Sequence, residues 1–180
     1  MGDREQDRDT AFQAFVVGRW ARLMRTAFLL TGEQHAAEDL VQSTLEQVYV
    51  AWRRVGAADE PEAYVRRVMI NAHARRHRRK LRELLAPRDD GPGLAHETPA
   101  PGDLIARADD RQTLLRALAA LPPRQRAAVV LRYWEDLTET QTAEAMGCSV
   151  GTVKSNAAKG IAKLRAIPEL ADGVMYGGRK

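Results

Sequence analysis

The segment from Thr138 to Arg165 constrains the fold of this chain more than any other stretch, because it carries the signals of two short helices joined by a tight turn. Thr138 and Gln141 form a Thr-x-x-Gln capping box, which satisfies free N–H groups at the start of a helix. Gly147 suits the left-handed residue that ends such a helix, and Ser149 suits the N-cap of the next one. These signals predict a helix-turn-helix, whose second helix normally enters the DNA major groove.

The second helix of this motif has two distinct faces. One face is apolar at helical spacing and is expected to lie on the core. Its residues are Val150, Val153, Ala157, Ile161 and Leu164. The other face carries hydroxyl, amide and amine groups, which suit base edges and phosphates. Its residues are Thr152, Ser155, Asn156, Lys159 and Lys163, with Lys154 at the edge. An ordinary amphipathic surface helix is the alternative interpretation.

A second basic feature lies between Arg66 and Arg82, where eight positive residues occur without an acidic one. The net charge of the whole chain is only +4, so this local concentration is the informative part. The residues are Arg66, Arg67, Arg75, Arg76, Arg78, Arg79, Lys80 and Arg82. Such a run favours a polyanion, and the phosphate backbone of a nucleic acid is the obvious candidate. A solvated helix face or a flexible basic tail would have the same composition.

Several classes of function are disfavoured by what the sequence contains. Cys148 is the only cysteine, so the sequence predicts neither a disulfide nor a cysteine-held metal. The histidines are scattered, and no nucleophile–base set or phosphate loop accompanies them, so neither an enzyme nor a cofactor is predicted. No apolar run is long enough to span a bilayer, and the charged N-terminus lacks the apolar core of a signal peptide. We therefore expect a soluble cytoplasmic protein that does not contact a membrane.

The whole pattern predicts an all-α fold of two small helical domains joined by a flexible linker. Apolar residues at helical spacing predict the first domain at residues 10–85, with helices near 35–54 and 62–84. Residues 86–103 hold four prolines and three glycines without an apolar period, which is typical of a flexible linker. The second domain, at 104–167, contains the helix-turn-helix, and a disordered tail is expected at 168–180.

Further expectations concern single residues. Thr31 and Gln34 repeat the capping-box pattern before the helix at 35–54. Trp20 and Trp134 fall on apolar stripes, so both are expected to be buried. The small side chain of Ala143 is expected to let the two helices of the helix-turn-helix cross closely.

The order of these parts resembles the extracytoplasmic-function (ECF) sigma factors, which belong to the sigma-70 family of bacterial RNA polymerase subunits. The resemblance covers roughly residues 10–166 and rests on four separated motifs. They are AEDLVQSTLEQVYVAW (37–52), EAYVRRVMINAHARRHRR (62–79), ALAALPPRQRAAVVLRYWEDLT (117–138) and GCSVGTVKSNAAKGIAKLR (147–165). The closing KSNAAKGIAKLR is similar to the SigE-like subgroup found in actinobacteria.

The resemblance implies a protein that binds core RNA polymerase and directs initiation by reading the −35 duplex and the melted −10 strand. Four consecutive residues match the motif that grips the clamp helices of the polymerase large subunit, and the flap is a second implied contact. These residues are Asp39, Leu40, Val41 and Gln42. Asn71 matches the asparagine that captures a base of the −10 strand, while nearby arginines hold its phosphates. The arginines are Arg67, Arg75, Arg76, Arg78 and Arg79. Contacts with the −35 element fall on Thr152, Lys154, Ser155 and Lys159.

One alternative function stays open at this point. A stand-alone transcriptional regulator with a LuxR-like helix-turn-helix would also carry the residues GTVK in its recognition helix. Such a protein is expected to have a sensory or receiver domain, often α/β, before the DNA-binding part. The helical pattern of the first domain and the basic run around Asn71 favour the sigma factor. The sequence leaves open whether an anti-sigma factor binds.

Overall fold

The computed structural model describes residues 2–85 and 106–171, and every regular element in these two ranges is helical. The first range holds α1 (Gly2–Thr31), α2 (Gln34–Val55) and α3 (Pro61–Leu85). The second holds α4 (Ala106–Ala120), α5 (Pro123–Val129), the π-helical turn η1 (Val130–Trp134), α6 (Glu139–Met146), α7 (Val150–Arg165) and α8 (Pro168–Ala171). The predicted all-α class is confirmed. No helix in the described ranges is long and apolar enough to cross a membrane.

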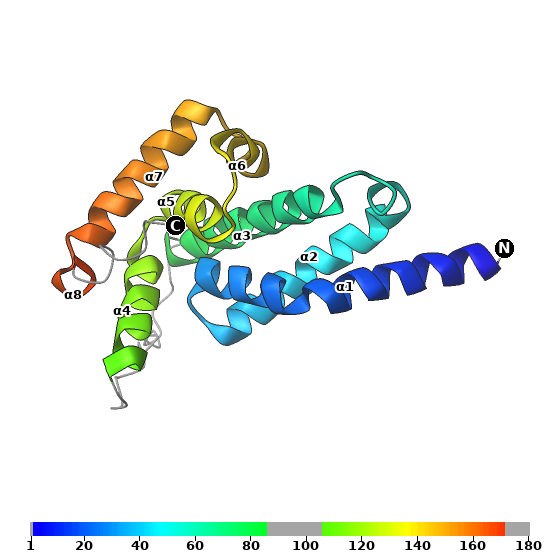
Figure 1. The fold of residues 1–180 in the computed structure, drawn as a ribbon, viewed down its shortest axis with the longest axis horizontal. Helices are drawn as coiled ribbons and strands as arrows, with labels where there is room; N and C mark the ends of the chain where they lie inside the picture. Colours follow the sequence, from blue (N-terminus) through cyan, green and yellow to red (C-terminus); the bar gives the residue numbers. More distant parts are fainter. Residues whose placement is uncertain (1, 86–105, 172–180) are drawn as a thin grey trace, which may run out of the picture.

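The first three helices pack along one another, with α1 extending well beyond the others at its N-terminal end (Figure 1). The predicted capping box at the start of α2 is wrong. The N-cap of α2 is Glu33, which makes no side-chain capping hydrogen bond. The Thr31 hydroxyl donates instead to the carbonyl of Ala27, 2.9 Å away, because α1 continues through Thr31. Gly32, with φ of 81°, then turns the chain toward α2.

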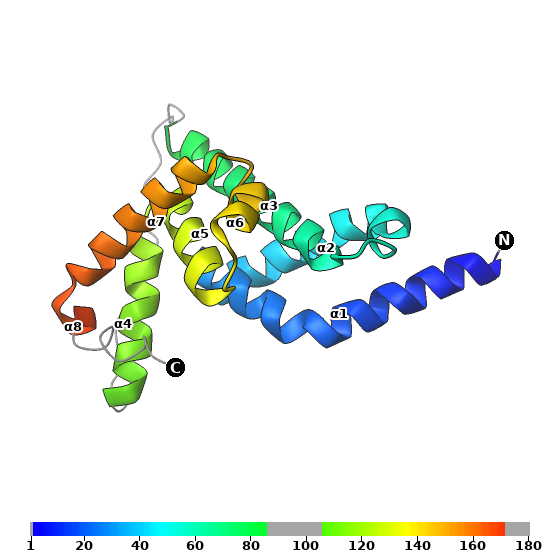
Figure 2. The same cartoon turned by 45° about the horizontal axis from the view of Figure 1, so that its top comes forward.

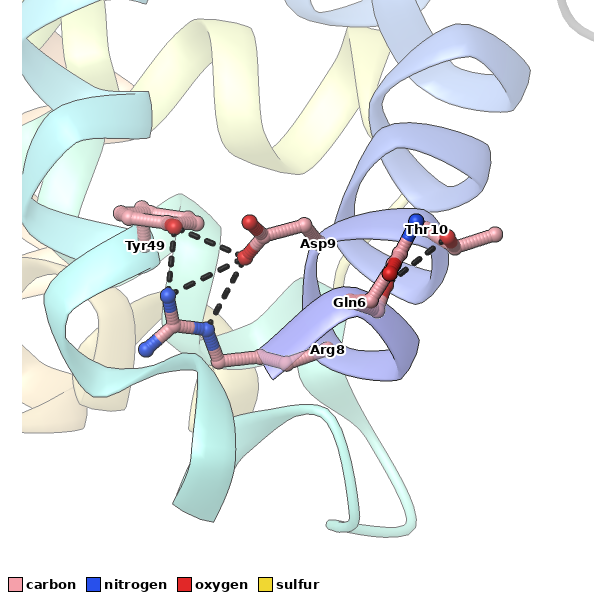
Figure 3. Close-up of polar contacts among 5 residues, drawn as sticks. All are labelled: Gln6, Arg8, Asp9, Thr10 and Tyr49. Carbon is pink, nitrogen blue, oxygen red and sulfur yellow. Dashed lines mark hydrogen bonds and ion pairs between the residues drawn. The ribbon is translucent and has the colours of Figure 1, made fainter. Parts of the chain in front are cut away.

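The N-terminal part of α1 is held on α2 by a cluster of aromatic and charged side chains, and Figure 3 shows the polar contacts among Arg8, Asp9 and Tyr49. The ring of Phe12 makes edge contacts with Tyr49 and Trp52, at centroid distances of 5.1 and 5.2 Å. The Tyr49 hydroxyl donates to Asp9 at 2.8 Å, and Arg8 lies over the Tyr49 ring at 4.7 Å. The hydrogen bonds from Tyr49 and Arg8 lower the pKa of Asp9. The cluster therefore favours one position of this end of α1.

The helix-turn-helix forms as predicted, with α6 and α7 as its two helices. The Thr138 hydroxyl accepts from the Gln141 backbone N–H at 3.2 Å, and the Gln141 side chain accepts from the Thr138 N–H at 2.9 Å. Gly147 adopts the left-handed conformation with φ of 60°, which ends α6. Ser149 caps α7 by accepting the N–H of Thr152. The capping box, the glycine turn and the second N-cap are therefore all confirmed.

Helix α7 lies close against α5 at Gly160. A Cβ atom at Gly160 would sit 2.7 Å from Val129 Cγ2 and 3.3 Å from the Gln125 carbonyl oxygen. Both distances are shorter than ordinary van der Waals contact. Ala143 is buried, as the close crossing of α6 and α7 requires, but the sequence did not point to Gly160.

Both tryptophans that were expected to be buried are exposed, Trp20 by 48 % and Trp134 by 54 %. Trp134 is displaced because residues 130–134 form a π-helical turn, in which the Glu135 N–H donates to the Val130 carbonyl. A wider turn changes the angular spacing of side chains, so the 3.6-residue period no longer brings residue 134 to the core. On α1, the neighbouring Arg19 is half-buried, and its guanidinium binds Glu62 at 2.5 Å.

The two helical units pack against each other and share one apolar core. In both views α6 lies beside α3, on the side away from the free end of α1, while α7 packs on α5 and α6 (Figures 1 and 2). The shared core includes Leu30, Leu40 and Met69 from the first unit, and Leu118 and Leu131 from the second. These side chains are almost fully buried, so joining the units removes apolar surface from water.

The disordered tail was predicted to begin at residue 168, but the chain is still helical there. Residues 168–171 form α8, and Leu170 is buried in the shared core. Residues 172–180 and the predicted linker at 86–103 lie outside the described residues. The proposed domain limits at 10–85 and 104–167 stay predictions.

Candidate nucleic-acid interface

The outer face of α7 holds all four residues predicted to contact the −35 element. Ser155 and Lys159 are exposed and point away from the core residues Val153 and Ala157. Thr152 is half-buried, and its hydroxyl lies 2.9 Å from the Ser149 hydroxyl at the helix start. The face therefore offers hydroxyl and amine groups near the helix N-terminus, where an anion is favoured.

Lys154, the fourth of these residues, is exposed but already has an internal partner. Its ammonium lies 3.3 Å from the Glu139 carboxylate of α6. An exposed pair of this kind contributes about 0–1 kcal/mol, so a phosphate could replace Glu139 at small cost. The pair links the two helices of the motif.

Most of the described residues of the basic run are exposed along α3. Asn71 is exposed, as are the arginines predicted to hold phosphates, which are Arg67, Arg75, Arg76, Arg78 and Arg79. The Arg75 guanidinium donates to the Gln47 side-chain oxygen at 3.0 Å, and Arg76 donates to Asp39 at 3.1 Å. The bonds that Arg75 and Arg76 donate to Gln47 and Asp39 tie α3 to α2. The face provides one neutral amide amid a high density of positive charge, which suits a single strand.

The four residues predicted to grip the polymerase do not share one surface. Asp39 and Gln42 are exposed on α2, whereas Leu40 and Val41 are only 2 % and 0 % exposed and lie in the shared core. Consecutive residues of a helix point about 100° apart, so four in a row cannot all face one partner. In this arrangement a partner reaches Asp39 and Gln42. The packing of Leu40 and Val41 positions the helix that presents them.

The junction between the units contains a buried carboxylate that the sequence did not single out. Glu135 has a side chain only 3 % exposed, and its Oε2 atom lies 2.7 Å from Arg22 Nη2 on α1. The Thr26 hydroxyl, also on α1, donates to the other carboxylate oxygen. We call this set of three residues the Glu135 contact. It joins the end of η1 to α1, and Asp136, the next residue, has a positive φ of 53°.

A buried arginine makes a second contact across the junction. Arg126 donates to the carbonyl of Leu30 at 2.7 Å, and to those of Ala119 and Leu121. These carbonyls lie at or just beyond the C-terminal ends of α1 and α4, where a positive charge is favoured. Burial lowers the pKa of Arg126. Burial, and then the nearby Arg126 charge, also lowers the pKa of His73 on α3, to about 4.

Comparison with known proteins assigns a family to both units. Residues 7–83 match the family described as Sigma-70 region 2, and residues 111–164 match the one described as Sigma-70, region 4. The chain is 38 % identical over 155 residues to the RNA polymerase sigma-E factor of Streptomyces coelicolor, covering 86 % of this chain and 84 % of that protein. The chain belongs to the sigma-70 family. It is a promoter-directing sigma factor of the ECF group, and its partners are core RNA polymerase and promoter DNA.

Other relatives and structures agree with this assignment. The sigma factor is 32 % identical over 145 residues to the ECF RNA polymerase sigma factor SigE of Mycolicibacterium smegmatis, covering 80 % of this chain and 56 % of that protein. Its fold resembles the sigma factor RpoE in complex with the anti-sigma factor NepR from Bartonella quintana, with a TM-score of 0.62 and 24 % identity. That match covers 92 % of this chain and 96 % of the other. The region 2 match excludes the LuxR-like alternative, because the part before the helix-turn-helix is itself a sigma domain.

Proposed function

We propose that this sigma factor reads a promoter with two separate surfaces, duplex at −35 with α7 and the melted −10 strand with α3. The observation that carries the proposal is that both polar faces are exposed and basic, and that each lies in the matching sigma region. The outer face of α7 offers hydroxyl and amine groups of the kind that bind base edges and phosphates in the major groove. They belong to Thr152, Ser155 and Lys159, with Lys154 beside them. Asn71 offers an amide to an unstacked base.

On α3, the arginines beside Asn71 hold the backbone of the melted strand in this proposal. Arg67, Arg75, Arg76, Arg78 and Arg79 supply positive charge along several turns of one helix. Such charge binds single strands without regard to sequence, so recognition falls to Asn71. Asp39 and Gln42 of α2 contact the clamp helices of the polymerase large subunit. Core polymerase supplies the catalysis, and the sigma factor acts where that enzyme is, in the cytoplasm.

Reading both elements requires the two helical units to separate. The element names place −35 and −10 about 25 base pairs apart, which is about 85 Å of B-form DNA. In the packed arrangement α6 lies along α3, and a groove of about 300 Å³ between them is lined by Arg66, Arg67, Gln141 and Glu144. With 16 residues, α7 is about 24 Å long and cannot bridge the difference. We therefore infer that the packed form is the state of the protein away from the promoter.

The structural relatives suggest one further partner class. RpoE was crystallised with the anti-sigma factor NepR, and CnrH, which has a TM-score of 0.57 to this chain, with the cytosolic domain of CnrY. The similarity of fold supports the proposal that an anti-sigma factor also binds this protein in the packed form.

The decisive experiment is in vitro transcription from genomic DNA fragments with purified core polymerase. We expect specific transcripts only when this protein and core polymerase are combined, because the polymerase surface must hold the DNA-binding faces of α7 and α3 apart. The protein alone is expected to bind the same fragments weakly in a footprinting assay. A tight footprint by the protein alone, unchanged by polymerase, would contradict the proposal.

Lys159→Ala is expected to weaken promoter binding by the holoenzyme by about 1 kcal/mol. This value is at the lower end for a base contact, because the lysine amine on its flexible stem is less directional than a bidentate arginine. The matched control is Lys163→Ala, which removes the same charge one turn further along α7. Binding constants measured at several salt concentrations check this. Equal losses in the two variants would show that general charge, rather than a contact at Lys159, is responsible.

A further inference from the structure

One ion pair joins the two surfaces that the proposed function assigns to different partners. Asp39 of α2 and Arg76 of α3 approach to 3.1 Å, with side chains 64 % and 42 % exposed. The pair lies in a groove of about 360 Å³ between the two helices, which Gln47, Arg75 and Arg79 also line. Asp39 belongs to the polymerase-binding surface, and Arg76 belongs to the surface for the −10 strand.

We propose that this ion pair couples polymerase binding to DNA binding. When a positively charged side chain of the polymerase binds the Asp39 carboxylate, Arg76 is released and can bind a phosphate of the melted strand. This inference rests on the proposed function. A guanidinium held by a carboxylate has fewer free donors for DNA, and the carboxylate also repels a phosphate within the roughly 10 Å over which charges act at 0.1 M salt. When a positive side chain of the polymerase binds Asp39, both effects decrease together.

The neighbouring contacts indicate why Asp39 is the residue that couples the surfaces. Arg75 is also held across the groove, but its partner Gln47 is a neutral amide, which does not repel a phosphate. Glu38 is an acid at the adjacent position of α2, yet it contacts residues of its own helix, Gln34 at 2.7 Å and His35 at 3.7 Å. Of Gln47, Glu38 and Asp39, only Asp39 forms an ion pair with an arginine of the surface for the −10 strand.

The size of the coupling follows from the exposure of the pair. Exposed ion pairs are worth little, so releasing Arg76 is expected to change DNA affinity about two- to fivefold. Coupling between two binding sites is reciprocal, so DNA at Arg76 strengthens the polymerase contact at Asp39 by the same factor. The ion pair therefore keeps DNA affinity low in the free protein without abolishing it.

The test uses the full-length protein and a fluorescent single-stranded DNA oligonucleotide without polymerase. Asp39→Asn is expected to bind the oligonucleotide about two- to fivefold more tightly than the original protein at low salt. Glu38→Gln removes an equal charge from the adjacent residue and is expected to change binding by a smaller factor. In an Arg76→Gln background, Asp39→Asn is expected to give no gain. Equal gains from Asp39→Asn and Glu38→Gln, or a gain that persists in Arg76→Gln, would overturn the inference.

A second measurement separates this inference from the function on which it rests. Binding of the same variants to core polymerase is measured by co-elution in gel filtration. If Asp39→Asn weakens polymerase binding but leaves DNA binding unchanged, the polymerase contact stands and the coupling is wrong. If Asp39→Asn binds polymerase normally, the assignment of Asp39 to the polymerase surface fails, and the coupling fails with it. The coupling is supported only when polymerase binding falls and DNA binding rises.

Discussion

Glu135→Ala is expected to lower the free energy of unfolding by about 2–3 kcal/mol, because it removes the carboxylate that joins the second helical unit to α1. The Glu135 side chain is almost completely buried, and it accepts from Arg22 and from the buried hydroxyl of Thr26. Arg22 is 53 % exposed and can be hydrated after the change, so the loss falls below that of a fully buried ion pair. Urea denaturation measures the loss, and small-angle X-ray scattering measures whether the units move apart.

The arginines of α1 provide the control for this prediction. Arg22→Ala removes the same ion pair from the other side, whereas Arg25→Ala removes an exposed arginine three residues further along. We expect Arg22→Ala to destabilise the protein and Arg25→Ala to have little effect. Arg22→Ala and Glu135→Ala combined should cost less than the sum of the single changes, since they remove one shared interaction. Strict additivity would mean that the carboxylate acts independently of Arg22.

The Glu135 contact is also relevant to the proposed function, because it holds together units that this function requires to separate on a promoter. The contact energy and the buried apolar surface of the shared core are lost on opening. Polymerase and promoter contacts must therefore exceed this cost before both elements are read. The packed state is maintained both by these buried polar contacts and by the shared apolar core, so partners must supply a binding energy comparable to the two together.

The helix-turn-helix was predictable in detail because its signals are local. Thr138, Gln141, Gly147 and Ser149 act on backbone groups within three or four residues, so no distant contact decides their conformation. The capping box expected at Thr31 failed because tertiary packing extends α1 through that residue. A local pattern predicts a cap only when the helix before it has already ended.

The junction and the ion pairs between helices could not be predicted, because they join residues far apart in the sequence. Glu135 binds Arg22 across 113 positions, and the π-helical turn that brings it to α1 has no clear local signal. Similarly, the basic run indicated an exposed arginine face on α3, and Arg76 lies on it, but its pairing with Asp39 depends on how α2 and α3 pack. Leu40 and Val41 were matched by motif alone, although the helical period already places them on the apolar side.

Gly160→Ala is expected to lower the free energy of unfolding by about 1–3 kcal/mol, although alanine normally favours a helix. The new Cβ atom would lie 2.7 Å from Val129 Cγ2, and Val129 is buried and β-branched, so its methyl cannot move easily. The Gln125 carbonyl, 3.3 Å away, limits movement on the other side. Helix α7 would have to shift away from α5, which disturbs the packing that holds the recognition helix in place. Thermal and urea unfolding measure the change.

Gly151 supplies the matched control within α7. Gly151→Ala makes the same chemical change in the first turn of the helix, where the nearest atom to the new Cβ is Ser149 Oγ at 3.9 Å. Its backbone is helical and exposed, so the variant is expected to gain up to about 1 kcal/mol from the higher helix propensity of alanine. The two variants should then differ by about 1–4 kcal/mol in the free energy of unfolding, with opposite signs. If both are stabilising, α7 does not approach α5 closely in solution, and the position of the recognition helix on the second unit would have to be revised.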